Sequence, residues 1–205
     1  TSNTITYNKL GIEFDGGATT ITDNVITNNT GSGQNAGGVL GSIDVQWGIF
    51  GSVVTISGNQ ISDNGSSGVS ISMQSNGTYT VTISGNTIVR NTGGGIKGSS
   101  GPGSTLNITN NYIADNAAGS GGGIYIWGTG NFNISYNRIH GNTATQGSAL
   151  YIAGANFEYN SITGGTGTSL IYKGSGATTI RYNNFVHKSE TYLISVPNGN
   201  TTADL

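Results

Sequence analysis

One short phrase built around asparagine recurs along this 205-residue chain and constrains its fold more than any other feature. It reads VVTISGNQISDN at 53–64, YTVTISGNTIVRN at 79–91, TLNITNNYIADN at 105–116 and NFNISYNRIHGN at 131–142. Aligned on the pattern apolar-x-x-Asn-x-Ile, the anchor asparagines from Asn59 onward lie 23 to 27 residues apart. A longer step of 35 residues separates Asn59 from Asn24. Repeats of this length are the signature of a solenoid in which each repeat forms one coil.

The residue types at fixed sequence offsets from each anchor also recur from repeat to repeat. An Ile or Phe stands three residues before and two residues after it, and a second Asn follows five residues later in five repeats. The local alternation has the period of two expected for strands. A further short segment, such as GGIYIW at 122–127, then follows, so we expect three short strands per coil. The anchors are Asn24, Asn59, Asn86, Asn111, Asn137, Asn160 and Asn183, and the second set is Asn29, Asn64, Asn91, Asn116 and Asn142.

Two properties of asparagine explain why it is kept while its neighbours vary. It tolerates the left-handed backbone conformation, so we expect the anchors themselves to occupy tight bends at positive φ. Coils paired as strands stack about 4.8 Å apart, so amides of successive anchors can hydrogen-bond along the axis. The sequence therefore predicts an all-β solenoid of about seven to eight coils, with three short strands per coil and an asparagine ladder.

The repeats carry a family resemblance. ISGNTIVRNTGGGIKG at 83–98, ITNNYIADNAAGSGGGIYIWG at 108–128 and ISYNRIHGNTATQGSALYIAG at 134–154 resemble repeats of right-handed parallel β-helix proteins, the pectate-lyase-like superfamily. They are still more similar to the adhesin-like and copper-maturation periplasmic-type repeats of bacterial and archaeal surface proteins. The resemblance covers roughly residues 15–196 and implies a single-stranded right-handed parallel β-helix. This fold hosts lyases, hydrolases, epimerases, phage tailspikes and adhesins, so it implies no single activity.

The chain is interpreted as one domain over residues 1–205, with a loop insertion at 41–52. The insertion carries Trp47, Ile49 and Phe50, and we interpret it either as a cap over the N-terminal coil or as a lip that contacts a ligand. The chain starts in mid-coil at TITYN and stops at NGNTTADL without an amphipathic capping helix. We therefore expect it to be excised from a longer protein.

Composition excludes several partners. Charged residues make up 8% of the chain, against about 25% in ordinary globular proteins. The net charge of −2 leaves no basic face for nucleic acid. No stretch approaches the ~18 apolar residues of a membrane span, so membrane insertion is not expected. The chain has 0 Cys and hence no disulfides, and together with the resemblance this predicts an extracellular or cell-surface location.

One outward column suggests the main candidate site. Because Ile124 and Ile126 point inward, Tyr125 points outward, and the equivalent column reads Leu40, Ser70, Lys97, Tyr125, Tyr151 and Ile171. Successive exposed aromatic rings beside a cation suit a sugar chain, since rings cover the apolar faces of sugars and a cation binds carboxylates. We expect Lys97, Tyr125, Trp127 and Tyr151 to bind a polysaccharide or cell-surface glycan. The alternative is that stacked tyrosines simply reinforce the strand ladder.

A second column holds charges and supports a rival, catalytic interpretation as a polysaccharide lyase or glycoside hydrolase, or a fragment of one. Asp63, Arg90 and Asp115 stand in three consecutive coils, and with Lys97 they are the candidates for catalysis. An inverting glycosidase needs carboxyls ~6.5–9.5 Å apart with one raised pKa, whereas Arg90 between the acids favours their ionised forms. Calcium prefers six to eight converging oxygens, so we predict no metal site and no cofactor, with calcium left open. The column is therefore interpreted as a salt ladder, and a non-catalytic binder is preferred.

A third outward surface suggests ice binding as a second alternative. Pairs of Thr or Ser flank the inward Ile before each anchor, similar to the ice-binding surfaces of β-solenoid antifreeze proteins. These ranks give way to Asn and Ser and end in Glu158 and Arg181. Strand propensity alone also favours Thr on such a face. The sequence makes no prediction of the oligomeric state. The candidate residues are Thr20, Thr22, Thr55, Ser57, Thr82, Ser84 and Thr109.

Overall fold

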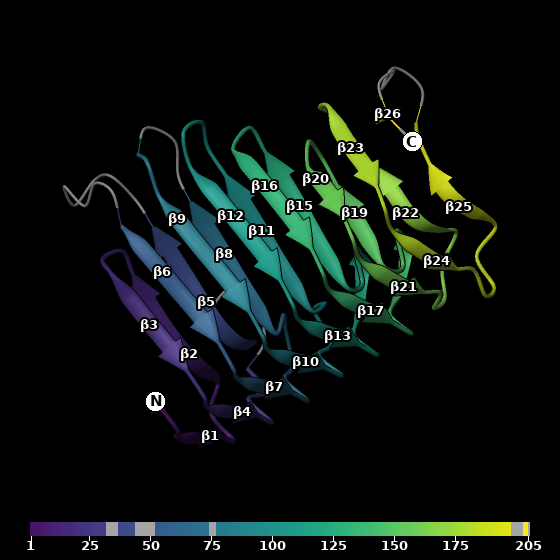
Figure 1. Cartoon of the computed structure of the whole chain (residues 1–205). Helices are drawn as coiled ribbons and strands as arrows, with labels where there is room; N and C mark the ends of the chain where they lie inside the picture. The colour runs from purple at the N-terminus through teal and green to yellow at the C-terminus, as the bar shows by residue number, and fades with distance from the viewer. Residues whose placement is uncertain (32–36, 44–51, 74–76, 198–202, 205) are drawn as a thin grey trace.

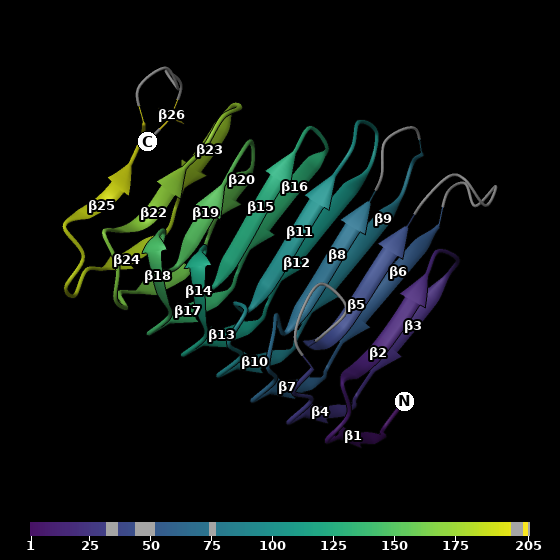
Figure 2. The same cartoon turned by 180° about the vertical axis from the view of Figure 1, so that it is seen from behind.

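The structure is a computed structural model that describes residues 1–31, 37–43, 52–73, 77–197 and 203–204. These residues form three parallel sheets of eight strands each and one two-stranded sheet. Figures 1 and 2 show the strands stacked as rungs along one axis, with the two termini at opposite ends. The described residues contain no helix, so none is long and apolar enough to span a membrane.

The strands fall into the sheets in a fixed rotation. Sheet 1 contains β1 (Thr4–Thr6), β4 (Val25–Thr27), β7 (Gln60–Ser62), β10 (Thr87–Val89), β13 (Tyr112–Ala114), β17 (Arg138–His140), β21 (Ser161–Thr163) and β24 (Asn184–Val186). Sheet 2 contains β2 (Leu10–Asp15), β5 (Gly37–Ile43), β8 (Val69–Met73), β11 (Ile96–Ser100), β15 (Ile124–Gly128), β19 (Leu150–Ile152), β22 (Ser169–Lys173) and β25 (Tyr192–Ser195).

Sheet 3 completes each coil before the chain returns to sheet 1. It contains β3 (Thr19–Thr22), β6 (Val53–Ser57), β9 (Thr80–Ser84), β12 (Thr105–Thr109), β16 (Asn131–Ser135), β20 (Asn156–Glu158), β23 (Thr178–Arg181) and β26 (Ala203–Asp204). The two-stranded sheet pairs β14 (Ala117–Ser120) with β18 (Thr143–Gln146), between sheets 1 and 2 along the chain. One strand per sheet per coil and eight strands per sheet confirm the predicted parallel β-helix with three strands per coil.

The core follows from in-register stacking of like residues. Ile88 pairs with Ile61 on one side and with Ile113 on the other, and all three side chains are fully buried. Inward residues of the three sheets join in one hydrophobic cluster along the axis. Because each coil covers the apolar face of its neighbour, no coil is stable alone. The cap and lip interpretations of the 41–52 insertion rest on Trp47, Ile49 and Phe50, which lie outside the described residues.

The predicted asparagine ladder is present. Asn86 donates from its backbone N–H and its Nδ2 to Oδ1 of Asn111, each at 3.0 Å. Asn111 donates to Oδ1 of Asn137 in the same way, again at 3.0 Å, and Nδ2 of Asn111 also donates to the Ile83 carbonyl at 2.8 Å. Equivalent bonds link the first series from Asn3 to Asn183 and a second, parallel series from Asn8 to Asn142.

The expectation that the anchors themselves adopt positive φ is wrong. The left-handed residue is the one before each anchor, with φ between 56° and 66° at Asp23, Gly58, Gly85, Asn110, Tyr136, Tyr159 and Tyr182. Asparagine is therefore required for its side chain. Its amide offers both an acceptor and donors, and this lets each rung bond its neighbours on both sides.

Glycine is the second residue that the repeat requires, and Gly95 shows why. A Cβ on Gly95 would stand 2.6 Å from the Gly123 carbonyl oxygen, 2.7 Å from Cγ2 of Ile113 and 3.1 Å from Nδ2 of Asn116. These contacts come from the next coil, whose corner passes directly over the glycine. Neighbouring coils place glycine at the same point, at Gly11, Gly38, Gly68 and Gly123.

Gly95→Ala is accordingly expected to lower the free energy of unfolding by about 2 kcal/mol, because the added methyl overpacks a rigid corner. Gly119→Ala is the matched control, since a Cβ there meets no atom within 4 Å. Thermal unfolding followed by circular dichroism compares the two variants. Equal midpoints for both would contradict the close packing of successive corners.

Candidate functional site

The outer face of sheet 2 carries the column predicted to bind a ligand. Lys97 pairs with Ser70 on one side and with Tyr125 on the other, and Tyr125 pairs with Tyr151. The column then continues to Tyr172, which pairs with Tyr151. The placement of Ile171 in this column is wrong, because Ile171 pairs with Leu150 and is fully buried. Strand alternation then turns Tyr172 outward, so sequence reasoning missed one member of the row.

The aromatic side chains on this face contact one another. The ring centroids of Tyr125 and Tyr151 are 4.6 Å apart with an interplanar angle of 43°, and Tyr125 and Trp127 are 5.1 Å apart at 45°. Tyr151 and Tyr172 are 4.8 Å apart at 18°. The ammonium of Lys97 lies 5.4 Å from the Trp127 ring centroid, within cation–π range. The structure thus brings the four predicted residues together and adds Tyr172.

The tilt of these rings decides what a ligand can reach. Rings inclined at 43° and 45° leave part of each face uncovered, and Trp127 remains 36% exposed. Burial raises the pKa of the Tyr151 hydroxyl, and the neighbouring Tyr125 and Tyr172 raise it further. The hydroxyl therefore stays protonated at neutral pH and remains a hydrogen-bond donor. The row combines apolar ring faces with polar rims and one cation.

A short wall borders this row. β14 and β18 lie beside the strands of sheet 2 (Figure 2), and residues of β14 line one side of a hollow of about 250 Å³. The hollow is lined by Gly93, Lys97, Ala118, Gly119, Ser120 and Tyr125. The sequence carries a signal for this wall in the longer step between its second asparagine and the next strand. Ile124 stands eight positions after Asn116, whereas Ile96 stands five positions after Asn91.

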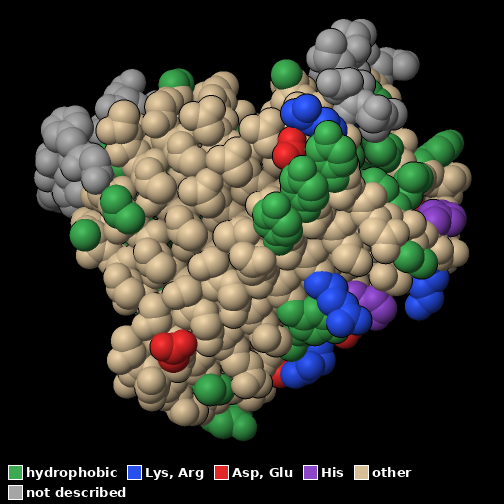
Figure 3. Space-filling model, in the orientation of Figure 1, with side chains coloured by type: hydrophobic (Ala, Val, Ile, Leu, Met, Phe, Trp, Pro, Cys, Tyr) green, Lys and Arg blue, Asp and Glu red, His purple; other side chains and the backbone are tan. Residues whose placement is uncertain are grey.

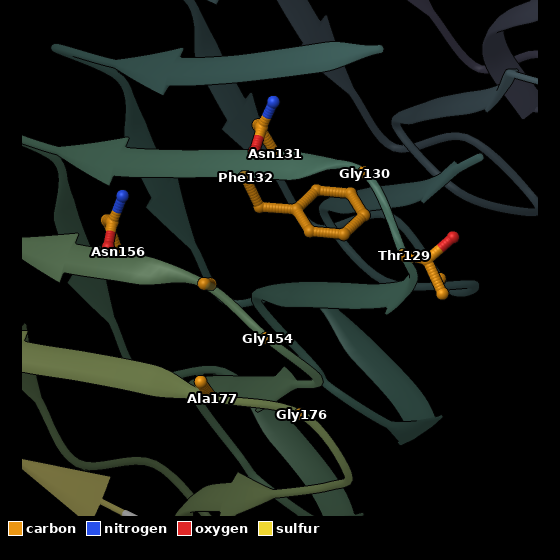
Figure 4. A pocket seen from close by; sticks show the side chains of 10 residues that line it. Thr129, Gly130, Asn131, Phe132, Gly154, Asn156, Gly176 and Ala177 are labelled. Carbon is orange, nitrogen blue, oxygen red and sulfur yellow. The ribbon is translucent and has the colours of Figure 1, made fainter. Parts of the chain in front are cut away.

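A second hollow, of about 400 Å³, lies at the turns between sheets 2 and 3 (Figure 4). It forms because Ile152 and Asn156 are four residues apart, whereas their partners one coil earlier, Ile126 and Asn133, are seven apart. The shorter turn leaves a step, floored largely by glycine and alanine. Phe132 underlies the step but is only 2% exposed, so the hollow offers little aromatic surface.

The charged column forms one ion pair. Nε and Nη2 of Arg90 each lie 2.7 Å from a carboxylate oxygen of Asp63. This hydrogen-bonded pairing lowers the pKa of Asp63. Asp115 acts on Arg90 through longer-range attraction. All three lie at positive φ at the corner between sheets 1 and 2, whereas Lys97 lies on sheet 2.

These positions weaken the catalytic candidates. A general acid needs a raised pKa, and the pKa of Asp63 moves the other way. Of the predicted salt ladder, the structure forms the ion pair between Asp63 and Arg90. Asp115, one coil further on, attracts Arg90 at longer range but forms no ion pair with it. Among the residues that the structure describes, no three His, Asp or Glu side chains gather closely enough to hold a metal ion.

The predicted Thr and Ser ranks lie in register on the outer face of sheet 3. Thr20, Thr55, Thr82 and Asn107 form one column, and Thr22, Ser57, Ser84 and Thr109 form the other. Further along, the second column continues through Ser135 into Glu158 and Arg181, which pair at 3.2 Å. The regular array therefore spans four coils and then gives way to charges.

Comparison with known proteins adds one finding. The family model described as the right handed beta helix region matches residues 47–204. Neither the curated proteins nor the solved structures yielded a significant match to this chain.

Proposed function

Because this chain belongs to the right-handed β-helix family, we propose that it is a non-catalytic module that binds a polysaccharide or cell-surface glycan. The observation that carries the proposal is the row of Lys97, Trp127, Tyr125, Tyr151 and Tyr172 on the outer face of sheet 2. The half-buried rings of Tyr125, Tyr151 and Tyr172 stand one coil apart, and the uncovered part of each can contact one sugar of an extended chain. An adhesin-like role at the cell surface or outside the cell fits such a module.

Binding along this row is weak at each contact and gains strength from repetition. An aromatic contact contributes about 1 kcal/mol, so several rings in line are needed for useful affinity. A long glycan also rebinds along the axis and to neighbouring molecules, which raises its apparent affinity. Lys97, at the end of the row, adds a contact for carboxylate-bearing sugars. The hollow beside Tyr125 would hold the edge of the chain.

Replacing Tyr125 and Trp127 together by Ala tests this site. Retention on beads carrying mixed-linkage β-glucan or polygalacturonate is expected to fall at least tenfold, because the two tilted rings beside Lys97 are removed. The thermal unfolding midpoint is expected to stay nearly unchanged, since both side chains are outward. Tyr112→Ala, which removes a ring on sheet 1, is the matched control and should retain binding. Unchanged retention of the double variant would overturn the choice of face.

The rival interpretation, a polysaccharide lyase or glycoside hydrolase, predicts different products. Incubation with polygalacturonate or β-glucan, with and without calcium, would then release unsaturated uronates or reducing ends. If such activity appeared and were lost in Asp115→Asn or Lys97→Ala, the catalytic interpretation would replace the binding proposal. Product formation is therefore measured on the same samples as retention.

A further inference from the structure

A second row of tyrosines lies at the corner between sheets 3 and 1, away from the site on sheet 2. Tyr136, Tyr159 and Tyr182 are 58%, 46% and 69% exposed. Their rings stack one coil apart, with centroid separations of 5.2 Å and 5.0 Å and interplanar angles of 5° and 17°. Figure 3 shows a row of hydrophobic side chains beside one basic and one acidic group. We call these three residues the corner ladder.

The backbone does not favour tyrosine at these positions. All three have φ of 56° or 57°, a left-handed conformation that costs a bulky residue more than it costs Gly, Asn or Asp. Earlier coils place Asp23, Gly58, Gly85 and Asn110 at the same point. Three successive coils thus carry a tyrosine at a left-handed position where Gly, Asn or Asp would form the turn with less backbone strain. A binding role for the exposed rings explains why tyrosine occupies these positions.

Polar groups next to the corner ladder indicate the kind of ligand. A hollow of about 220 Å³ on sheet 3 is lined by Asn133, Ile134, Ser135, Asn156, Glu158 and Arg181. Glu158 and Arg181 pair with each other at 3.2 Å, so their charges largely cancel. Nδ2 of Asn156 donates to Oδ1 of Asn133 at 3.2 Å. Amides and a paired charge beside aromatic rings suit a neutral ligand rich in hydroxyl groups, such as a sugar chain.

The corner ladder and the aromatic residues of the sheet 2 row occupy the same coils but face different ways. Ile124 and Ile126 of β15 and Phe132 and Ile134 of β16 enter one shared core. The outer faces of sheets 2 and 3 therefore point away from each other. A chain bound along the sheet 2 row leaves the corner ladder free.

We propose that the corner ladder is a second glycan-binding surface, and that one molecule bridges two glycan chains held on different sides. The inference rests on the proposed binding function and goes beyond it, since a single site cannot bridge. The corner ladder is the weaker surface, because its nearly parallel rings cover one another and present mainly their edges and hydroxyls.

A capture experiment tests the bridge. Beads carrying mixed-linkage β-glucan are loaded with protein, washed, and exposed to fluorescein-labelled soluble β-glucan. Wild-type protein is expected to capture the labelled chain. The triple variant Tyr136→Gly, Tyr159→Gly, Tyr182→Gly uses the residue that other coils carry at this position, so its unfolding midpoint should not fall. It is expected to stay on the beads within threefold of wild type while capture of the labelled chain falls at least tenfold.

Each result separates the two proposals. If wild-type protein is not retained by the beads, the proposed function fails, and the bridge with it. If wild-type protein is retained but captures no labelled chain, the bridge fails and the single-site function stands. Capture by the triple variant at the wild-type level also overturns the bridge, as does a large drop in its unfolding midpoint, which would make the ladder structural. A wild-type dimer that the triple variant converts to monomer assigns the ladder to self-association instead.

Discussion

Replacing Asn111 by Val is expected to lower the free energy of unfolding by about 3–5 kcal/mol, because each buried polar group left without a partner costs about 1–3 kcal/mol. The side chain of Asn111 accepts from the backbone N–H and the Nδ2 of Asn86 and donates to the Ile83 carbonyl and to Asn137. Asn111 is 2% exposed, so water cannot replace these bonds. Valine offers no donor or acceptor, and the ladder is cut at its middle.

Asn107→Val is the matched control for this prediction. Asn107 lies on the outer face of β12, and its half-buried side chain accepts a hydrogen bond from Nδ2 of Asn133. Its loss is expected to cost less than about 1 kcal/mol. Thermal and urea unfolding of both variants give the comparison. An Asn111→Val protein as stable as the Asn107→Val protein would show that the ladder is not a main source of stability.

Removing the carboxylate of Glu190 is expected to loosen the last described coil, at a cost of about 3 kcal/mol in the free energy of opening that coil. The second asparagine series ends at Asn142, and the next coil carries Gly165 where another Asn would stand. Oε1 of Glu190 accepts from the Gly165 N–H at 2.6 Å and from the Ser148 hydroxyl at 2.8 Å. Glu190 is 3% exposed, and its carboxylate gives the Gly165 N–H the acceptor that an asparagine one coil further on, where Lys188 stands, would have provided.

The effect of Glu190→Ala should be local, since each coil of a solenoid contacts only its neighbours. Hydrogen exchange should therefore accelerate in β24 and β25 and stay unchanged in β7 to β9. Glu158→Ala is the control, because an exposed ion pair contributes about 0–1 kcal/mol. Exchange that is equally fast in both variants would contradict the role given to Glu190.

The same carboxylate makes the last coil sensitive to acid. Burial raises the pKa of Glu190, but hydrogen bonds from Ser148, Gly165 and nearby backbone outweigh it, so the pKa is lowered overall. A folded-state pKa below the unfolded value stabilises the coil above the unfolded pKa, and this contribution is lost as pH falls through the folded pKa. Protection of β25 should thus decline in acid for the wild type, and Glu190→Gln should remove that dependence. The linkage would be excluded if β25 of the wild type were equally protected at a pH above the unfolded pKa of Glu190 and at a pH below its folded pKa.

Much of the architecture was determined by the sequence alone, and the reason is the in-register stacking of coils. When coils stack in parallel, residues at equal distance from successive anchors become neighbours in space. The spacing of Asn86, Asn111 and Asn137 therefore predicts their hydrogen-bonded ladder, and it places Lys97, Tyr125 and Tyr151 in one outward column. The family of the chain follows from the same regularity.

Tertiary structure decided the features that arise where coils differ in length or where distant residues meet. After a turn of irregular length, the number of residues from the anchor no longer predicts which side chains face outward. The pairing of the buried Ile171 with Leu150 decided that Tyr172 faces outward. The wall of β14 and β18 needs the extra residues of two successive coils to pair with each other. Glu190 reaches Ser148 across 42 residues, a contact that no local pattern encodes. Periodic spacing thus determines the regular rungs, and packing between unequal coils decides the rest.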